Sequence, residues 1–325
     1  MLTWFHNLEL INLTGDWDYY ASMATSLRVY LFEHGAIPLW NFHFCGGRPE
    51  LANPQSWGYV WPSLFAYLFP GNLAQFMLWI ALTLVGFFSM KSFLFALGSG
   101  KYGSWAGALL YVFNGYFASH FNIGHVTFAF FHLVPLLLLQ ALNLWRESVP
   151  EKVLSKGLWL TLSTFLFFTA AIPHGLFYFY PVVPLFVAIL FIIESKDRGR
   201  KIAKKRLFTL LVYHVLGIGL SSYRLWPILS WQMNFPRQDV RIEGLTIYDI
   251  ITNSLRYFND YNNPLIKQFE NQVWLIWEYN AFVGPIPWLL LLMTLVLIWK
   301  KKLLTTHLNL RPLFFLGVLL FFRQT

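Results

Sequence analysis

Long apolar runs separated by short polar connections dominate the pattern of this chain. A helix that crosses a bilayer needs about 20 mostly apolar residues. The pattern predicts seven such helices, at residues 73–97, 105–119, 126–145, 158–171, 176–193, 207–229 and 282–299. A last apolar run, 313–322, is too short to cross. Two of the seven runs are also short, and we expect each to gain a turn from its neighbours or to cross partly or at a tilt.

The positions of the basic residues orient these helices. Lys and Arg collect in the cytoplasmic connections of membrane proteins. With 15–72 outside and each run crossing once, fifteen of the 24 basic residues fall in the inside connections, which are 98–104, 146–157, 194–206 and 300–312. Ten of the fifteen acidic residues fall instead in the outside segments 15–72 and 231–280. The two biases predict one orientation.

The same pattern divides the chain into five parts. They are an incomplete N-terminal helix (1–14), a first extracytoplasmic loop (15–72), six transmembrane helices (73–230), a second extracytoplasmic segment (231–280) and a truncated pair of C-terminal helices (281–325). Within the first loop, QSWGYVWPSLFAYLFP at 55–70 predicts two interfacial helices separated at Pro62. The predicted fold class is an all-α polytopic membrane protein.

Composition supports a membrane protein and excludes several other classes. Hydrophobic residues make up 57% of the chain and charged residues 12%, about half the charged fraction of a soluble domain. The net charge of +9 lies in short runs between apolar stretches, so it indicates membrane loops and no nucleic-acid partner. The single cysteine, Cys45, excludes an internal disulfide framework. Nucleotide-binding and soluble-hydrolase motifs are missing, so we expect a substrate that arrives already activated on a membrane carrier.

Asp, His and Arg side chains gather on the predicted outer face. Asp16 and Asp18 open the first loop, and their oxygens suit a general base or a divalent cation. A histidine in the outer turn 119–125 or 172–175 would complete a cation site or bind phosphate. An arginine would hold phosphate with its paired donors. The candidates for these two roles are His120, His125, His174, Arg48 and Arg224.

Each candidate also has a simpler interpretation. An Asp-x-Asp pair often caps a helix, and a histidine in a turn is more often bonded to a turn carbonyl. Arg224, near the end of a predicted span, would then extend its side chain to the membrane interface. Spacing alone does not choose between these interpretations.

Four segments carry a resemblance to a known family. They are GDWDYY with IPLWNFHFCGGRPELANPQSWGYVWPSLFAYLFP, the turn 122–125 followed by a helix with Pro135, GIGLSSYRLWP, and EYNAFVG at 278–284. In this order they resemble the YfhO-like bacterial membrane proteins, within the GT-C superfamily of polyprenyl-phosphate-dependent glycosyltransferases. The matches extend from Gly15 to about Leu292.

The resemblance implies a GT-C-like helix bundle in the bacterial inner membrane. It implies transfer of a sugar from a polyprenyl-phosphate donor to a glycan or lipid acceptor on the extracytoplasmic face. Asp16 matches the family's loop aspartate, a catalytic base or metal-site residue, and His125 matches its outer-turn histidine. With Asp18, these residues are the expected ligands of a divalent cation, Mg²⁺ or Mn²⁺. Family members extend beyond this chain at both ends, which implies a truncated product.

Two other functions stay open at this stage. A transporter or lipid flippase would carry charged or discontinuous helices near the bilayer midplane. The ionisable residues at that depth are Lys91, His132 and His214, and the chain has no internal repeat that pairs them. A non-catalytic membrane partner, or an inactive truncated remnant, would tolerate loss of both aspartates.

Overall fold

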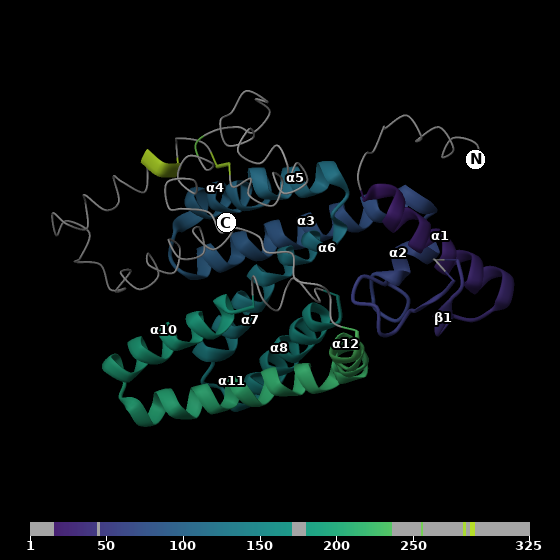
Figure 1. Ribbon diagram of the computed structural model, residues 1–325. Coiled ribbons are helices and arrows are strands. Elements are labelled where there is room, and N and C mark those ends of the chain that lie inside the picture. Colours follow the sequence, from purple (N-terminus) through teal and green to yellow (C-terminus); the bar gives the residue numbers. More distant parts are fainter. Residues whose placement is uncertain are drawn as a thin grey trace.

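The computed structural model describes residues 16–43, 46–170 and 180–235, together with 255, 282, 283 and 287–289. The described part is mostly helical (Figure 1). Its elements are α1 (Trp17–His34), β1 (Trp40–Asn41), β2 (Arg48–Pro49), α2 (Ser63–Leu68), α3 (Gly71–Ala96), α4 (Gly100–Val112), α5 (Gly115–Ile123), α6 (Val126–Ala129), the 3₁₀ helix η3 (Phe130–Leu133), α7 (Val134–Arg146), α8 (Pro150–Ala170), α10 (Val182–Asp197), α11 (Arg200–Leu220) and α12 (Ser222–Asn234).

Among the described residues, three segments are long and apolar enough to cross a membrane: Gly71–Ala96, Val126–Arg146 and Pro150–Ala170. They correspond to three of the predicted spans, and α8 begins eight residues before the predicted 158. The predicted span 176–193 corresponds to α10, and its first residues lie outside the described part. The predicted span 282–299 and the segments 1–14, 231–280 and 281–325 also lie largely outside it.

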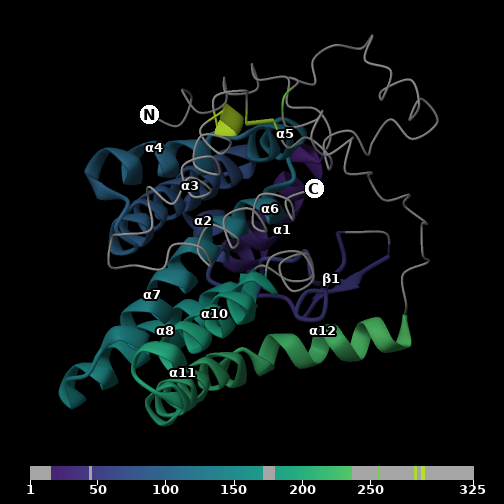
Figure 2. The ribbon, with the colours of Figure 1, turned by 90° about the vertical axis from the view of Figure 1, so that its left-hand side faces the viewer.

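The helices pack in both senses, since α3/α4 and α7/α8 run antiparallel whereas α3/α7 and α8/α11 run parallel. Helix α3 packs on α4 and α7, while α8 packs on α7 and α11 (Figures 1 and 2). The amide of Gln75, at the start of α3, donates to the carbonyl of Trp17 at 2.8 Å. At the other end of α3, the Arg146 guanidinium donates to the Ala96 carbonyl at 2.7 Å. The two ends of the bundle are called here the α1 end, which contains Trp17, and the opposite basic end, which contains Arg146.

Helices α8 and α11 both end at the α1 end of the bundle, as the predicted connections require. The indole of Trp61, in the first loop, donates to the Leu166 carbonyl near the end of α8 at 3.0 Å. The Tyr223 hydroxyl, at the start of α12, donates to the Tyr59 carbonyl of the same loop at 2.8 Å. The α10–α11 turn lies at the far end of these helices (Figure 2). The first loop therefore covers the ends of α8 and α11.

Three predicted spans are interrupted helices, and one of them, 207–229, is divided at Ser221 between α11 and α12. The predicted span 105–119 is divided between α4 and α5, because Asn114 leaves helical geometry and its side chain accepts from the Phe117 amide at 3.0 Å. The predicted span 126–145 contains the 3₁₀ turn η3 before α7. Pro135 has no amide hydrogen, so it cannot bond the Phe131 carbonyl four residues earlier. The Tyr111 hydroxyl of α4 donates to that carbonyl instead, at 2.8 Å.

The prediction of two interfacial helices at 55–70 is wrong in its first half. Only α2 is helical there, and residues 55–62 form turns. Arg224 supplies a physical reason at the start of this segment, where its guanidinium binds the Ser56 carbonyl. Its terminal nitrogens donate to the carbonyls of Glu50, Leu51, Asn53 and Ser56. Carbonyls that point at one buried cation cannot at the same time follow a helix axis.

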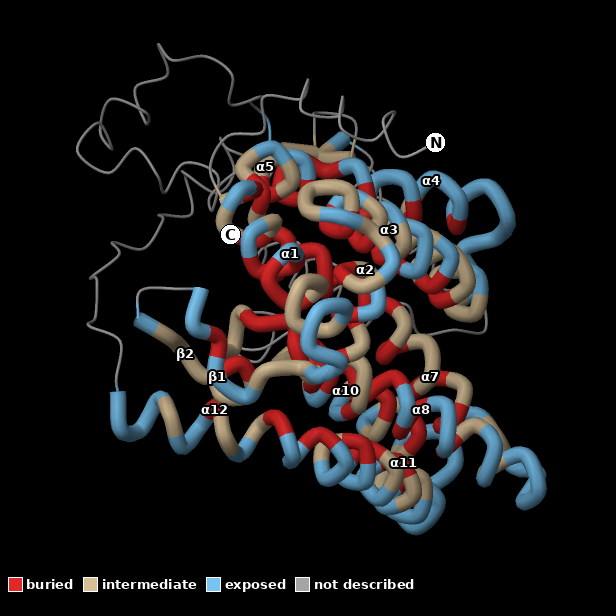
Figure 3. The backbone as a smooth tube through the Cα atoms, turned by 90° about the vertical axis from the view of Figure 1, so that its right-hand side faces the viewer, coloured by how far each residue is buried: buried red, intermediate tan, exposed pale blue. Residues whose placement is uncertain are grey.

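Buried residues concentrate where the first loop, α3 and α7 meet, and outer faces of α4, α11 and α12 are exposed (Figure 3). The core is rich in aromatic rings, including the fully buried Trp17, Phe131 and Phe186. Exposed faces are largely apolar as well, with Phe208 at 70% and Trp226 at 74% exposed. Large apolar side chains on both the inside and the outside of a helix bundle are typical of membrane helices.

Candidate active site at the α1 end

The first turn of α1 is bound to the end of α5. The Asp16 amide donates to the Ile123 carbonyl at 2.7 Å, and the Trp17 indole donates to the Phe121 carbonyl at 2.9 Å. Gly124 ends α5 with φ of 85°, a left-handed conformation that glycine adopts without strain. It also lets the chains approach closely, since a Cβ there would lie 2.7 Å from Cγ of Trp17. Two segments more than 100 residues apart therefore meet at Asp16.

Asp16 lies against His125 at this junction. The Nε2 atom of His125 is 3.3 Å from Oδ2 of Asp16. Asp16 stands at the N-cap position of α1, but its carboxylate makes no capping hydrogen bond there. Asp16 therefore does not cap α1 with its side chain. Its side chain is 48% exposed, so one side of the carboxylate remains open to a ligand.

His125 is in turn bonded to a second histidine. Its Nδ1 atom is 3.0 Å from Nδ1 of His120. His120 is fully buried, stacked at 3.8 Å between ring centroids on Phe128 and edge-on to Tyr116 at 4.4 Å. A neutral His125 that donates from Nε2 to Asp16 accepts at Nδ1, so His120 then donates from its own Nδ1. The result is a chain of three groups running from the surface into the core.

The other sequence candidates lie apart from this chain. Asp18 is exposed in the first turn of α1, where its charge favours the helix N-terminus. His174 lies outside the described residues. Arg224 is 1% exposed, and four loop carbonyls accept hydrogen bonds from its terminal nitrogens. The structure therefore brings together Asp16, His125 and His120, and places Arg224 in the interior beneath the first loop.

Arg48 lies in a second polar cluster, connected to α1 through Tyr19. Its guanidinium donates to the Tyr19 hydroxyl at 3.0 Å, and that hydroxyl donates to the Gln55 side chain at 3.1 Å. Tyr19 lies in the first turn of α1, three residues after the N-cap residue Asp16. The Arg48 side chain is 15% exposed, and its Nε is 3.8 Å from a carboxylate oxygen of Glu50.

Glu50 is a buried carboxylate that the sequence analysis did not single out. It is 1% exposed, accepts from the Asn41 amide at 2.7 Å and also accepts from the Ser56 hydroxyl. Burial raises the pKa of the Glu50 carboxyl, although the bond from Asn41 and the charges of Arg48 and Arg224 act in the opposite direction. No spacing in the sequence marks this residue, because its partners come from the hairpin, the loop and α12.

Tyr20 supplies a neutral hydroxyl beside the candidate base. It is 2% exposed, and burial raises the pKa of its hydroxyl, with a further contribution from the Asp16 charge. The hydroxyl lies near Thr127 of α6 and accepts from the Gln55 amide at 3.4 Å. The Tyr20 hydroxyl therefore remains protonated.

The described residues bring no third His, Cys, Asp or Glu to the Asp16–His125 pair to complete a metal-ligand group. Asp16 and His125 would offer two ligands, and the expected third, Asp18, does not join them in such a group. Divalent cations bound by protein oxygen ligands usually have six or more ligands in all. The described part of the chain thus does not by itself fit a complete cation site.

Comparison of the chain with models of protein families, with curated proteins and with solved structures finds no significant match.

Proposed function

We propose that this chain is an integral membrane glycosyltransferase that moves a sugar from a polyprenyl phosphate to a hydroxyl of a glycan or lipid. The α1 end would face the extracytoplasmic side of a bacterial inner membrane. Three helices able to cross a membrane support the placement in a bilayer. The orientation is supported by the Lys and Arg of the basic end, since cytoplasmic loops carry the excess of these residues.

The contact between Asp16 and His125 is the observation that carries the proposed chemistry. Asp16 takes the proton from the acceptor hydroxyl while the oxygen of that hydroxyl forms a bond to the anomeric carbon of the sugar. The bond from that carbon to the phosphate oxygen breaks, and the polyprenyl phosphate leaves with the electron pair. General base catalysis of this kind needs a carboxylate that is held in place and remains accessible. The Asp16 side chain meets both conditions.

His125 and His120 hold the base in position. The imidazole of His125 fixes one oxygen of Asp16, and His120 fixes the ring of His125 from the buried side. A carboxylate held by a neutral imidazole retains its negative charge and its orientation. His120 is fully buried, so we assign it a positioning role in place of the substrate contact expected from its turn.

Arg48 is the proposed contact for the phosphate of the donor. It is connected to the first turn of α1, which follows Asp16, through its bond to Tyr19, and its side chain is partly exposed. A guanidinium offers paired donors that match phosphate oxygens. No step is assigned to a metal ion, because the described residues do not complete a cation site.

The test uses purified protein in lipid nanodiscs with radiolabelled polyprenyl-phosphate sugars, with and without Mg²⁺ or Mn²⁺. Asp16→Asn is expected to lower turnover by about 100-fold or more, the usual contribution of a general base. Glu33→Gln, an exposed carboxylate near the other end of α1, is the matched control and is expected to leave turnover unchanged. Asp18→Asn distinguishes the two aspartates and is expected to have a much smaller effect. Equal turnover in wild type and Asp16→Asn would sink the proposal.

A second candidate function, transport across the membrane, is favoured by one observation. The α4–α5 and α6–α7 segments are both interrupted, and the fully buried His132 lies on η3, stacked at 3.9 Å on Phe117 of α5. Discontinuous helices around a buried ionisable group are characteristic of secondary transporters. Uptake of a solute or lipid scrambling in proteoliposomes, lost in His132→Gln and unaffected by Asp16→Asn, would favour transport over sugar transfer.

A further inference from the structure

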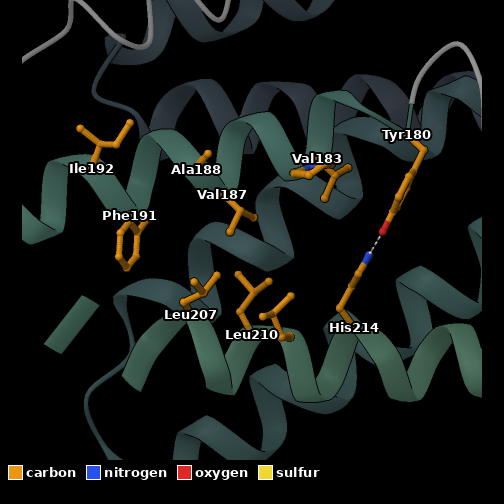
Figure 4. A pocket seen from close by; sticks show the side chains of 11 residues that line it. Tyr180, Val183, Val187, Ala188, Phe191, Ile192, Leu207, Leu210 and His214 are labelled. Carbon is orange, nitrogen blue, oxygen red and sulfur yellow. Dashed lines mark hydrogen bonds between the residues drawn. The ribbon is translucent and has the colours of Figure 1, made fainter. Parts of the chain in front are cut away.

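An apolar groove of about 350 Å³ lies between α10 and α11, away from the α1–α5 junction. Its walls include Val187, Ala188 and Phe191 of α10 and Leu207, Leu210 and Leu211 of α11 (Figure 4). One end is closed by polar side chains, because the Tyr180 hydroxyl lies 2.7 Å from Nε2 of His214 (Figure 4). The groove therefore has an apolar body that runs from this polar end toward the basic end of the bundle.

The length of the groove fits one hydrocarbon chain. The wall formed by Tyr180 and α10 extends from Tyr180 to Ile192, which corresponds to about 18 Å at the rise of an α-helix. One leaflet of a bilayer is about 15 Å deep in its hydrocarbon part. A single acyl chain of a lipid in the leaflet at the basic end thus matches the groove in both chemistry and length.

Cations stand where the headgroup of such a lipid would lie. Lys204 and Arg200 precede Leu207 by three and seven residues, so they continue the groove-facing stripe of α11 toward the turn. Lys196 follows Ile192 by four residues and continues the corresponding stripe of α10. All three side chains are exposed.

These three cations have no ion pair within the part of the chain that the structure describes, whereas two neighbouring arginines do. The carboxylate of Glu194 lies 3.2 Å from Arg206 and 3.7 Å from Arg198. The single carboxylate of Glu194 therefore offsets part of the charge of these two arginines. The exposed Asp197 of the same turn offsets part of the remaining positive charge.

We propose that the α10–α11 groove binds one anionic phospholipid, with an acyl chain in the groove and the phosphate at Lys196, Arg200 and Lys204. Charge complementarity selects this occupant over a zwitterionic lipid, since cations near a membrane surface attract anionic headgroups. The proposal rests on the membrane placement given above and is independent of sugar transfer. It places a second lipid site at the end of the bundle opposite to Asp16.

The test is native mass spectrometry of the purified full chain with phosphatidylglycerol or phosphatidylcholine of identical acyl chains. Phosphatidylglycerol is expected to bind about tenfold tighter or more. The triple variant Lys196→Gln, Arg200→Gln, Lys204→Gln is expected to lose this preference. A control triple, Lys101→Gln, Lys152→Gln, Lys205→Gln, removes the same charge from exposed positions off the groove and is expected to keep it.

A second pair of variants tests the apolar part. Ala188→Trp fills the groove and is expected to weaken binding of both lipids, whereas Val215→Trp, at an exposed position not among the groove residues, is not. Equal affinity for the two lipids, equal loss in both triple variants, or unchanged binding in Ala188→Trp would each overturn the proposal. The proposal would also be overturned by a dimer of the chain that Ala188→Trp abolishes, because a second copy would then occupy the groove. Displacement of the lipid by glycerol phosphate would overturn it as well, because the headgroup alone would then account for binding. None of these readouts depends on glycosyltransferase activity, so the two proposals fail separately.

Discussion

Gly124 and Trp17 are in such close contact that a Cβ on Gly124 would meet both the backbone nitrogen and the indole of Trp17. This contact joins the end of α5 to the start of α1. It sets the position of Asp16 next to His125, because Asp16 immediately precedes Trp17 and His125 immediately follows Gly124. The close packing of Gly124 on Trp17 thus positions both the proposed base and its partner.

Replacing that glycine is expected to separate the pair. Gly124→Ala introduces a clash with Trp17 and a residue with φ of 85°, so we expect a loss of at least about 2 kcal/mol in stability, together with loss of sugar transfer. Thermal unfolding in detergent and the radiolabel assay measure the two effects. Gly219→Ala is the matched control, since a Cβ there meets nothing within 4 Å, and it is expected to stay within about 1 kcal/mol of wild type. Wild-type behaviour of Gly124→Ala would contradict the described junction.

The interruption at η3 predicts an energetic coupling between Tyr111 and Pro135. Tyr111→Phe removes the donor to the Phe131 carbonyl and is expected to cost about 1–3 kcal/mol in the free energy of unfolding. In a Pro135→Ala background the restored amide can satisfy that carbonyl, so the same substitution is expected to cost less. A double-mutant cycle from unfolding in mixed micelles measures the difference. Strictly additive effects would mean that the hydroxyl does not replace the missing amide.

Arg224 is expected to control the order of the first loop. Arg224→Lys keeps the charge but loses the planar fork that reaches several carbonyls at once. Hydrogen exchange of residues 50–62, followed by mass spectrometry, is expected to become at least about tenfold faster, because a loop that loses its bonds opens more often. Arg198→Lys, at an exposed pair, is the control and is expected to leave exchange in this loop unchanged. A loop as protected as in wild type would argue against the proposed role of the guanidinium.

Glu50 predicts a pH dependence of stability with a definite sign. Its pKa in the folded protein is raised above the ordinary value of 4.5, so folding disfavours the ionised form. The free energy of unfolding contributed by this group is therefore highest below 4.5 and falls as pH rises through the raised pKa. Thermal unfolding between about pH 4 and pH 7 should show this decline, and Glu50→Gln should flatten it.

The Gln side chain can accept from Asn41 and donate to Ser56, so Glu50→Gln keeps both partners of the carboxylate. We therefore expect the variant to be at least as stable as wild type at neutral pH. A variant that is less stable at neutral pH and keeps the wild-type slope would show that the ionised carboxylate is the favoured form in the folded loop.

The sequence alone predicted the apolar helices of the bundle and which end each connection occupies, although it assigned the residues of α1 to a loop. An apolar run such as the one that became α3 is long enough to require a helix, because a helix satisfies its own backbone in an apolar environment. Short connections then place successive turns at alternate ends. That is why Asp16 and the turn 119–125, although far apart in the chain, could be expected at one face before any contact was known.

Only the tertiary structure decided how those helices break and what the polar residues bind. The 3₁₀ turn before Pro135 depends on a donor from another segment, the Tyr111 hydroxyl. Arg224 was expected at a phosphate or the interface, but its hydrogen bonds go to carbonyls more than 160 residues away. A local pattern records which positions are apolar, whereas the partner of a polar group is set by chain segments that meet only in the folded protein.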